Sequence, residues 1–147
     1  MSATTSTTHA TASTSRATSV VRGVLGGIAG GIVFGMLMQM MGMIPMVAMM
    51  VGSESVAVGW VIHLAISAFI GASFAVLLGS RVHDVKTGLA FGIGYGIVWW
   101  VLGALIAMPA RLGMPVFDLN TTAMQSLMGH VIFGAILGAV VAALGRR

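Results

Sequence analysis

The sequence predicts an all-α integral membrane protein, a bundle of four transmembrane helices. Its composition is the first reason, because 58% of the 147 residues are hydrophobic and only 7% are charged, whereas a soluble domain usually carries about 25% charged residues. Four apolar segments are the second reason, since each has roughly the 20 residues that a helix needs to cross a hydrocarbon core. These segments cover residues 23–43, 56–79, 88–108 and 123–145, and their interiors contain no Lys, Arg, Asp or Glu.

The residues before the first apolar segment are expected to form a tail. Residues 1–18 are rich in Ser, Thr and Ala and poor in large apolar side chains, a composition that does not support a packed structure. We therefore expect a disordered Ser/Thr-rich cytoplasmic tail over residues 1–18 and a four-helix transmembrane domain over residues 19–147.

The few cationic side chains predict the orientation of the chain. Six of them flank the segments on the side of the two termini and the central loop, and one, Arg111, lies on the opposite side. Cytoplasmic loops carry the excess of Lys and Arg, so both termini are expected in the cytoplasm and the chain in the cytoplasmic (inner) membrane of a bacterium or archaeon. The net charge of +4 is explained by these topology-determining residues. We therefore do not interpret it as a sign of nucleic-acid binding and expect no nucleic-acid partner. The six residues are Arg16, Arg22, Arg81, Lys86, Arg146 and Arg147.

Glycines recur at every fourth position within the apolar segments. Residues four apart share one face of a helix, and small residues on such a face let transmembrane helices approach closely. Because the glycine stripe of residues 23–43 is longer than one contact needs, we expect a homo-oligomer or another membrane protein as partner, besides the lipid bilayer. The predicted packing positions are Gly27, Gly31, Gly35, Gly71, Gly92, Gly96, Gly134 and Gly138.

The first and third segments resemble each other, and so do the second and fourth. Residues 27–35 align with residues 88–96 at an offset of 61 residues, with matching glycines and with Phe34 opposite Tyr95. The alignment then pairs His63 with His130. Two copies of one helical hairpin, each with two spans, would enter the membrane in the same direction and be related by an axis along the membrane normal.

Two histidines lie inside the apolar segments and form the first candidate site. An ionisable residue inside the membrane is costly and is a functional hypothesis by default. His63, Ser67 and His130 lie on the small-residue stripes, so we expect them to face the bundle interior as a polar centre. Three uses remain open: a hydrogen bond to a neighbouring helix, a titrating or proton-relaying pair, and ligation of a metal or haem.

Methionines at the end of the first segment offer a second set of ligands. On a continuous helix Met36, Met40 and Met43 would share one face, and thioethers are soft ligands suited to Cu(I). Methionine is also a common apolar filler. We therefore expect no cofactor, with haem b or copper held by His63, His130 and these methionines as the alternative.

Charged residues at the outer ends of the segments form a third candidate group. Asp118 and Arg111 lie in the loop before the fourth segment, and Glu54 lies before the second. We expect an ion pair at the rim, or entrance charges that guide cations toward the histidines. Asn120 or Thr121 is expected to cap the fourth helix.

The bilayer segments contain no acid pair, nucleophile–base arrangement or phosphate loop, so an enzyme is not expected. The leading hypothesis is a small non-enzymatic protein whose histidine pair responds to pH or supports permeation of protons or small solutes. One alternative is a haem- or copper-binding subunit of a redox or metal-handling system. A structural accessory subunit of a membrane complex is the other.

The residues Pro115-Val-Phe-Asp-Leu119 are followed by Gly129-His130, with His63 and Ser67 on the earlier helix. Over roughly Gly59–Gly138 this pattern resembles the YagU-like family of small bacterial inner-membrane proteins. The resemblance implies an inner-membrane location and directs attention to His63, Asp118 and His130. It implies no particular reaction, cofactor or transported species, and the first outer loop is shorter here than family members can have.

Overall fold

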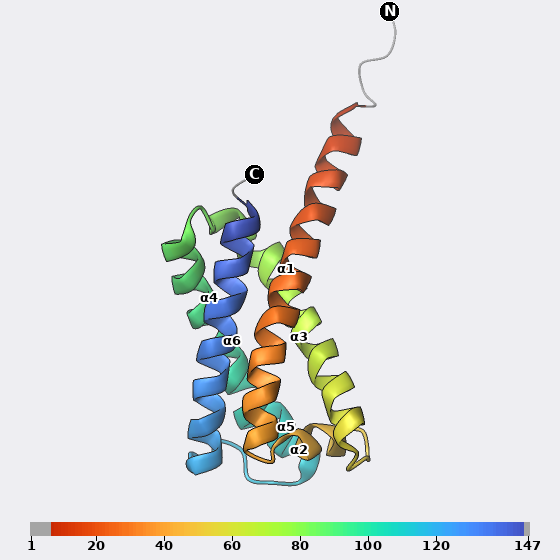
Figure 1. Ribbon diagram of the computed structural model, residues 1–147, viewed down its shortest axis with the longest axis vertical. Coiled ribbons are helices and arrows are strands. Elements are labelled where there is room, and N and C mark those ends of the chain that lie inside the picture. Colours follow the sequence, from red (N-terminus) through yellow and green to blue (C-terminus); the bar gives the residue numbers. More distant parts are fainter. Residues whose placement is uncertain (1–6, 146–147) are drawn as a thin grey trace, which may run out of the picture.

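The computed structural model describes residues 7–145, with side chains described from Arg16 onward. Every regular element in this part of the chain is helical (Figure 1). The elements are α1 (Thr7–Met40), α2 (Ile44–Met49), α3 (Val56–Leu78), the 3-10 turn η1 (Gly79–Arg81), α4 (Val85–Trp99), the π-helix η2 (Trp100–Ala107), α5 (Met108–Leu112) and α6 (Thr121–Gly145).

Four helical stretches are long and apolar enough to cross a membrane, which confirms the predicted all-α four-helix membrane bundle. They run over Arg16–Met40, Val56–Arg81, Val85–Leu112 and Thr121–Gly145. The third span, Val85–Leu112, joins α4, η2 and α5 without a break and extends past the expected end at Met108. Pro109 allows this because it lies in the first turn of α5, where a missing backbone N–H is tolerated.

The first helix begins earlier than the sequence led us to expect. It starts at Thr7, so residues 7–18 of the expected disordered tail are helical, while residues 1–6 lie outside the described residues. Once a helix is nucleated, each further residue adds one hydrogen bond. The apolar segment that starts at Gly23 therefore supports helix in the more polar residues before it.

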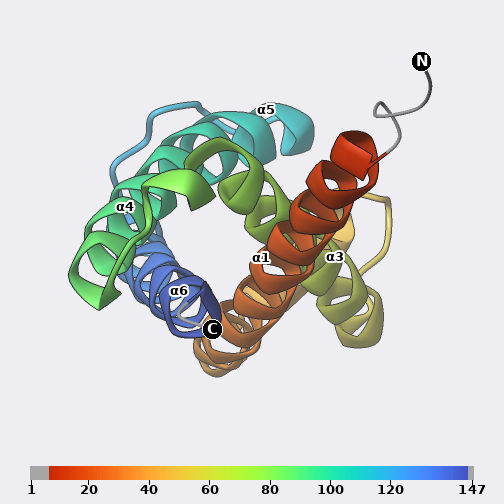
Figure 2. The ribbon, with the colours of Figure 1, turned by 90° about the horizontal axis from the view of Figure 1, so that it is seen from above.

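The long helices form a ring in which one pair of neighbours is poorly packed (Figure 2). α1 packs along α3 and against α6, and α6 packs along α4, whereas α3 and α4 touch at few places. The ends of α1 and α6 that carry the termini lie at the same end of the bundle as η1, and α2 and α5 lie at the other end (Figure 1).

Glycine stripes make the α1–α3 and α4–α6 contacts close. A Cβ atom added to Gly23 would overlap the carbonyl oxygen of Gly71, and one added to Gly71 would overlap that of Gly23. Gly88 and Gly138 have the same reciprocal relation in the α4–α6 contact. At each of the eight glycines predicted as packing positions, an added Cβ atom would overlap an atom of a neighbouring helix.

The two contacts repeat in register, but not in the register of the sequence alignment. The Gly23–Gly71 contact between α1 and α3 corresponds to the Gly88–Gly138 contact between α4 and α6. Gly23 is therefore matched with Gly88, an offset of 65 residues. The alignment of the sequence placed Gly27 opposite Gly88, which differs by four residues, or about one helical turn. Matching glycines every four residues make both alignments possible, and the contacts select one of them.

The glycines of α1 are used within a single chain. Gly23, Gly27, Gly31 and Gly35 lie against α3, while Gly30 on a second face lies against α6, where an added Cβ would be 2.8 Å from the carbonyl oxygen of Phe133. The length of the stripe, which suggested an oligomer, is thus accounted for by contacts inside the bundle. Association with a second chain stays a prediction.

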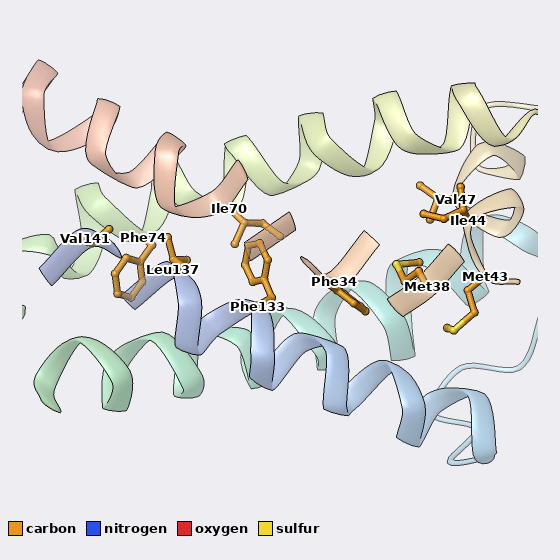
Figure 3. Close-up of a cluster of buried hydrophobic side chains, with 10 residues drawn as sticks. All are labelled: Phe34, Met38, Met43, Ile44, Val47, Ile70, Phe74, Phe133, Leu137 and Val141. Atoms are coloured by element: carbon orange, nitrogen blue, oxygen red, sulfur yellow. The ribbon is translucent and has the colours of Figure 1, made fainter. Parts of the chain in front are cut away.

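A column of buried apolar side chains runs along the bundle axis (Figure 3). Towards the termini, Phe74 of α3 and Leu137 of α6 are fully buried. Towards the other end, Phe34 and Met38 of α1 approach Ile44 and residues near it. The column is therefore continuous from the end with the termini to α2.

Replacing Gly92 by Ala tests the close α4–α6 contact. The new methyl group would overlap the carbonyl oxygen of Gly134, and overpacking of this kind costs about 1–3 kcal/mol. The matched control is Gly94→Ala on the same helix, where an added Cβ meets nothing within 4 Å. Reversible unfolding in mixed detergent should show Gly92→Ala clearly destabilised and Gly94→Ala unchanged or slightly stabilised. Equal stability of the two variants would contradict the contact.

Candidate functional site

The two intramembrane histidines meet around one phenyl ring. His63 comes from α3, His130 from α6 and Phe34 from α1. The ring centroid of Phe34 lies 5.5 Å from that of His63 and 4.8 Å from that of His130, both in edge-to-face geometry. Such contacts are favourable beyond simple burial. Three different helices therefore hold the pair.

His63 is anchored to the backbone of α1. Its Nε2 lies 2.9 Å from the carbonyl oxygen of Gly31, and a carbonyl only accepts, so Nε2 carries the proton that is donated. A side chain on Gly31 would overlap Ser67 and keep α3 away from this carbonyl. Ser67 does not bind the ring, because its hydroxyl donates to the carbonyl oxygen of His63 at 2.8 Å, one turn earlier in α3.

His130 is anchored within its own helix. Its Nδ1 donates to the carbonyl oxygen of Ser126 at 2.8 Å and lies 3.3 Å from the hydroxyl oxygen of the same serine. Ser126 is therefore part of the polar centre, although it was not among the predicted site residues. Its position four residues before His130, on the same helix face, was the available signal.

Each imidazole has one ring nitrogen left over. Nδ1 of His63 and Nε2 of His130 make no hydrogen bond to any residue that the structure describes. In a neutral imidazole whose other nitrogen donates, this nitrogen is an acceptor, and after protonation it becomes a donor. The centre thus presents two groups whose hydrogen-bonding role changes with protonation.

Both histidines line a cavity of about 330 Å³. It lies between α3 and the third span, where these two spans pack poorly. Its wall is mostly apolar and includes Phe34, Phe69, Trp99 and Phe133, while its polar side chains belong to the two histidines and to Ser67, Ser126 and the Trp99 indole. The combination of an apolar wall with a few polar groups is typical of small-molecule sites.

The π-helix η2 forms one side of this cavity. Gly103, Ala104 and Ala107 of η2 line it, and their small side chains leave space opposite α3. A π-helical stretch is rare and frequently occurs at functional sites. The outer loop is tied to it, since the Phe117 N–H donates to the carbonyl oxygen of Leu105 at 2.9 Å. No pattern in the sequence predicted η2.

The cavity ends before Phe74 and Leu137, neither of which lines it. Both side chains are fully buried and lie in the part of the apolar column nearer the termini (Figure 3). Among the described residues, the site is therefore a cavity in the half of the bundle near α2 and α5 and not a continuous pore.

The expected methionine face is wrong because α1 ends at Met40. Met36 and Met40 are 57% and 83% exposed. Gly42, with a φ of 70°, turns the chain, and Met43 is buried beside the cavity. Met38, on another face of α1, lines the cavity instead. The turn brings Met43 inward and leaves Met36 and Met40 outside.

Haem fits this arrangement poorly. Axial ligation by both histidines would have to release His63 Nε2 from Gly31 and would have to separate both imidazoles from Phe34. Among the side chains described, residues 16–145, no group of three or more His, Asp or Glu is placed to hold a metal.

The rim residues are exposed and do not form the expected ion pair. Within the described chain Asp118 makes no salt bridge to Arg111, and its carboxylate accepts a hydrogen bond from the Asn120 amide at 2.9 Å. Asn120 in turn caps α6, because its side-chain oxygen accepts from the Ala123 N–H at 2.9 Å. Glu54 is exposed before α3. None of the three charged residues lines the cavity.

Comparison of the chain with protein-family models, curated proteins and solved structures finds no match.

Truncating Phe34 tests whether it holds the histidine pair. Phe34→Ala removes a buried ring in contact with both imidazoles, and such a change costs about 3–5 kcal/mol. Met36→Ala on the exposed side of the same helix is the control. Unfolding in mixed detergent should separate the two variants by several kcal/mol, and a loss smaller than that of Met36→Ala would contradict the packing described.

Proposed function

We propose that the chain is a non-enzymatic multi-pass membrane protein that binds a small molecule at its histidine centre and releases or retains it according to pH. One observation carries the proposal: His63 and His130 line the same cavity, and each has one ring nitrogen without a partner in the described chain. Protonation would add a donor and a positive charge at each of them.

Binding is favoured over steady permeation by the apolar column. A proton or solute that crossed the bundle would have to pass Phe74 and Leu137, which are fully buried. The cavity is lined by neither Phe74 nor Leu137, so binding there requires no such passage. Permeation therefore requires a second conformation, whereas binding does not.

Two further proposals accompany this one and are supported by the sequence alone. The excess of Lys and Arg at the end with the termini supports a cytoplasmic position for both of them in the cytoplasmic membrane. The segment Pro115–Leu119, Gly129 and His130 supports membership of the YagU-like family.

Solid-state NMR of ¹⁵N-histidine-labelled protein in lipid bilayers tests the pH response. At about pH 8 we expect the Nε2–H form of His63 and the Nδ1–H form of His130, and on lowering the pH we expect conversion of both to imidazolium while the protein is folded. His63→Gln and His130→Gln assign the signals among the four histidines of the chain. If neither His63 nor His130 gains a proton before the protein unfolds, the pH-responsive centre is ruled out.

Copper binding is a second candidate because thioethers share the cavity with the imidazoles. Met38, Met43, Met50 and Met108 all line it, and thioether and imidazole ligands suit Cu(I). This set differs from the one predicted from the sequence, since Met36 and Met40 are exposed.

Anaerobic loading with Cu(I), followed by metal analysis, tests this candidate. We expect about one copper per chain, lost in the double variant Met38→Leu, Met43→Leu and kept in the control Met36→Leu, Met40→Leu. Equal copper in both variants, or none in the unmodified protein, would remove copper from consideration.

A further inference from the structure

The seam between α3 and the third span borders the cavity. Near the termini this seam is closed, since the hydroxyls of Ser73 and Tyr95 are 2.8 Å apart and the rings of Phe74 and Tyr95 are 5.4 Å apart. Further along, Phe69 and Trp99 make an edge-to-face contact at 6.0 Å, and both line the cavity. Beyond this contact the two spans separate around the cavity.

Part of the cavity wall also faces the outside of the bundle. Phe69 is 62% exposed and Ile66 is 37% exposed, yet both line the cavity. Outside a membrane-spanning helix lies the lipid, so these side chains border both the bilayer and the cavity. This part of the wall therefore separates the cavity from the bilayer by single side chains, which makes the bilayer the nearest source of a ligand.

The unused polar groups define what this molecule must carry. Both serine hydroxyls already have partners within α3 and α6. Two acceptors remain in the neutral state, Nδ1 of His63 and Nε2 of His130. An acyl chain would leave both unsatisfied, which is unfavourable. A ring hydroxyl can donate to them.

The size and wall of the cavity favour a single ring. About 330 Å³ is near the lower end of the range of ligand pockets, so a ring with the start of its tail fits better than a two-chain lipid. Phe34, Phe69, Trp99 and Phe133 surround the space, and aromatic rings pack favourably on one another at their edges and faces.

We propose that the cavity binds, from the bilayer, an apolar-tailed ring compound with a free hydroxyl group, of the phenol or hydroquinone class. The hydroxyl donates to an imidazole nitrogen. This assignment rests on the proposed use of the cavity as a binding site and names its ligand class. No redox step is part of it.

Binding of 2-decyl-1,4-hydroquinone to the protein in nanodiscs under argon tests this assignment, with empty nanodiscs subtracted. We expect saturable binding of about one molecule per chain, and binding about three- to tenfold weaker for the dimethyl ether of the same compound, which cannot donate. Equal affinities of the two compounds would overturn the assignment.

The position of the site is tested by filling it. Ala104→Phe on η2 places a ring in the cavity, whereas Leu102→Phe changes an exposed residue of η2 that does not line it. Binding should be lost in the first variant and kept in the second, and hydroquinone binding that survives Ala104→Phe would overturn the proposed site. If Ala104→Phe does not fold, a diazirine in the tail of the probe locates it in the unmodified protein. Labelling of α3 and η2 is expected, and labelling confined to other helices would overturn the site.

These outcomes are separate from the test of the proposed function. Histidine titration in the bilayer without hydroquinone preference would leave the pH-responsive centre intact and remove the ligand class. Hydroquinone binding without histidine titration would leave the ligand class intact and remove the pH-responsive centre.

Discussion

Close backbone contact along two glycine stripes is the constraint on which the rest of this structure depends. In a bilayer the hydrophobic effect does not draw helices together, so close packing of small residues must do so. Here Gly23 meets Gly71 in one helix pair, and Gly88 meets Gly138 in the other. The join between the pairs is made by α1 and α6, through Gly26 and Gly30. No comparable stripe joins α3 to the third span, and the cavity lies at that seam.

The same stripes explain how a histidine is tolerated in the membrane. A buried polar group without a partner is costly. Side chains normally keep the backbone carbonyl oxygens of one helix out of reach of a neighbouring helix. A Cβ atom on Gly31 would overlap Ser67 of α3, so the missing side chain lets the two helices come close enough for the Gly31 carbonyl oxygen to accept from His63. His130 is satisfied within α6. Each histidine therefore uses one nitrogen for the fold and keeps the other for the cavity.

Much of the fold was predictable, because membrane spans are set by local composition. Apolar length and the absence of charge identified the four spans, and the spacing of four residues identified the packing glycines. The register in which the two helix pairs correspond was not predictable, because a glycine every fourth residue matches equally well after a shift of one turn. The site was only partly predictable: His63, Ser67 and His130 are brought to one cavity, but Met36 and Met40 point away. The turn at Gly42 ended the helical periodicity on which that prediction relied.

The sequence by itself determined that this chain crosses a membrane with four helices. It also determined which faces of those helices carry residues small enough for close packing. Those properties depend on single segments and their residue spacing. Only the tertiary structure decided that α3 and the third span stay apart, that η2 departs from the α-helix beside them, and that Phe34 holds both imidazoles at one cavity. These features depend on contacts between helices, which the pattern within any one helix does not contain.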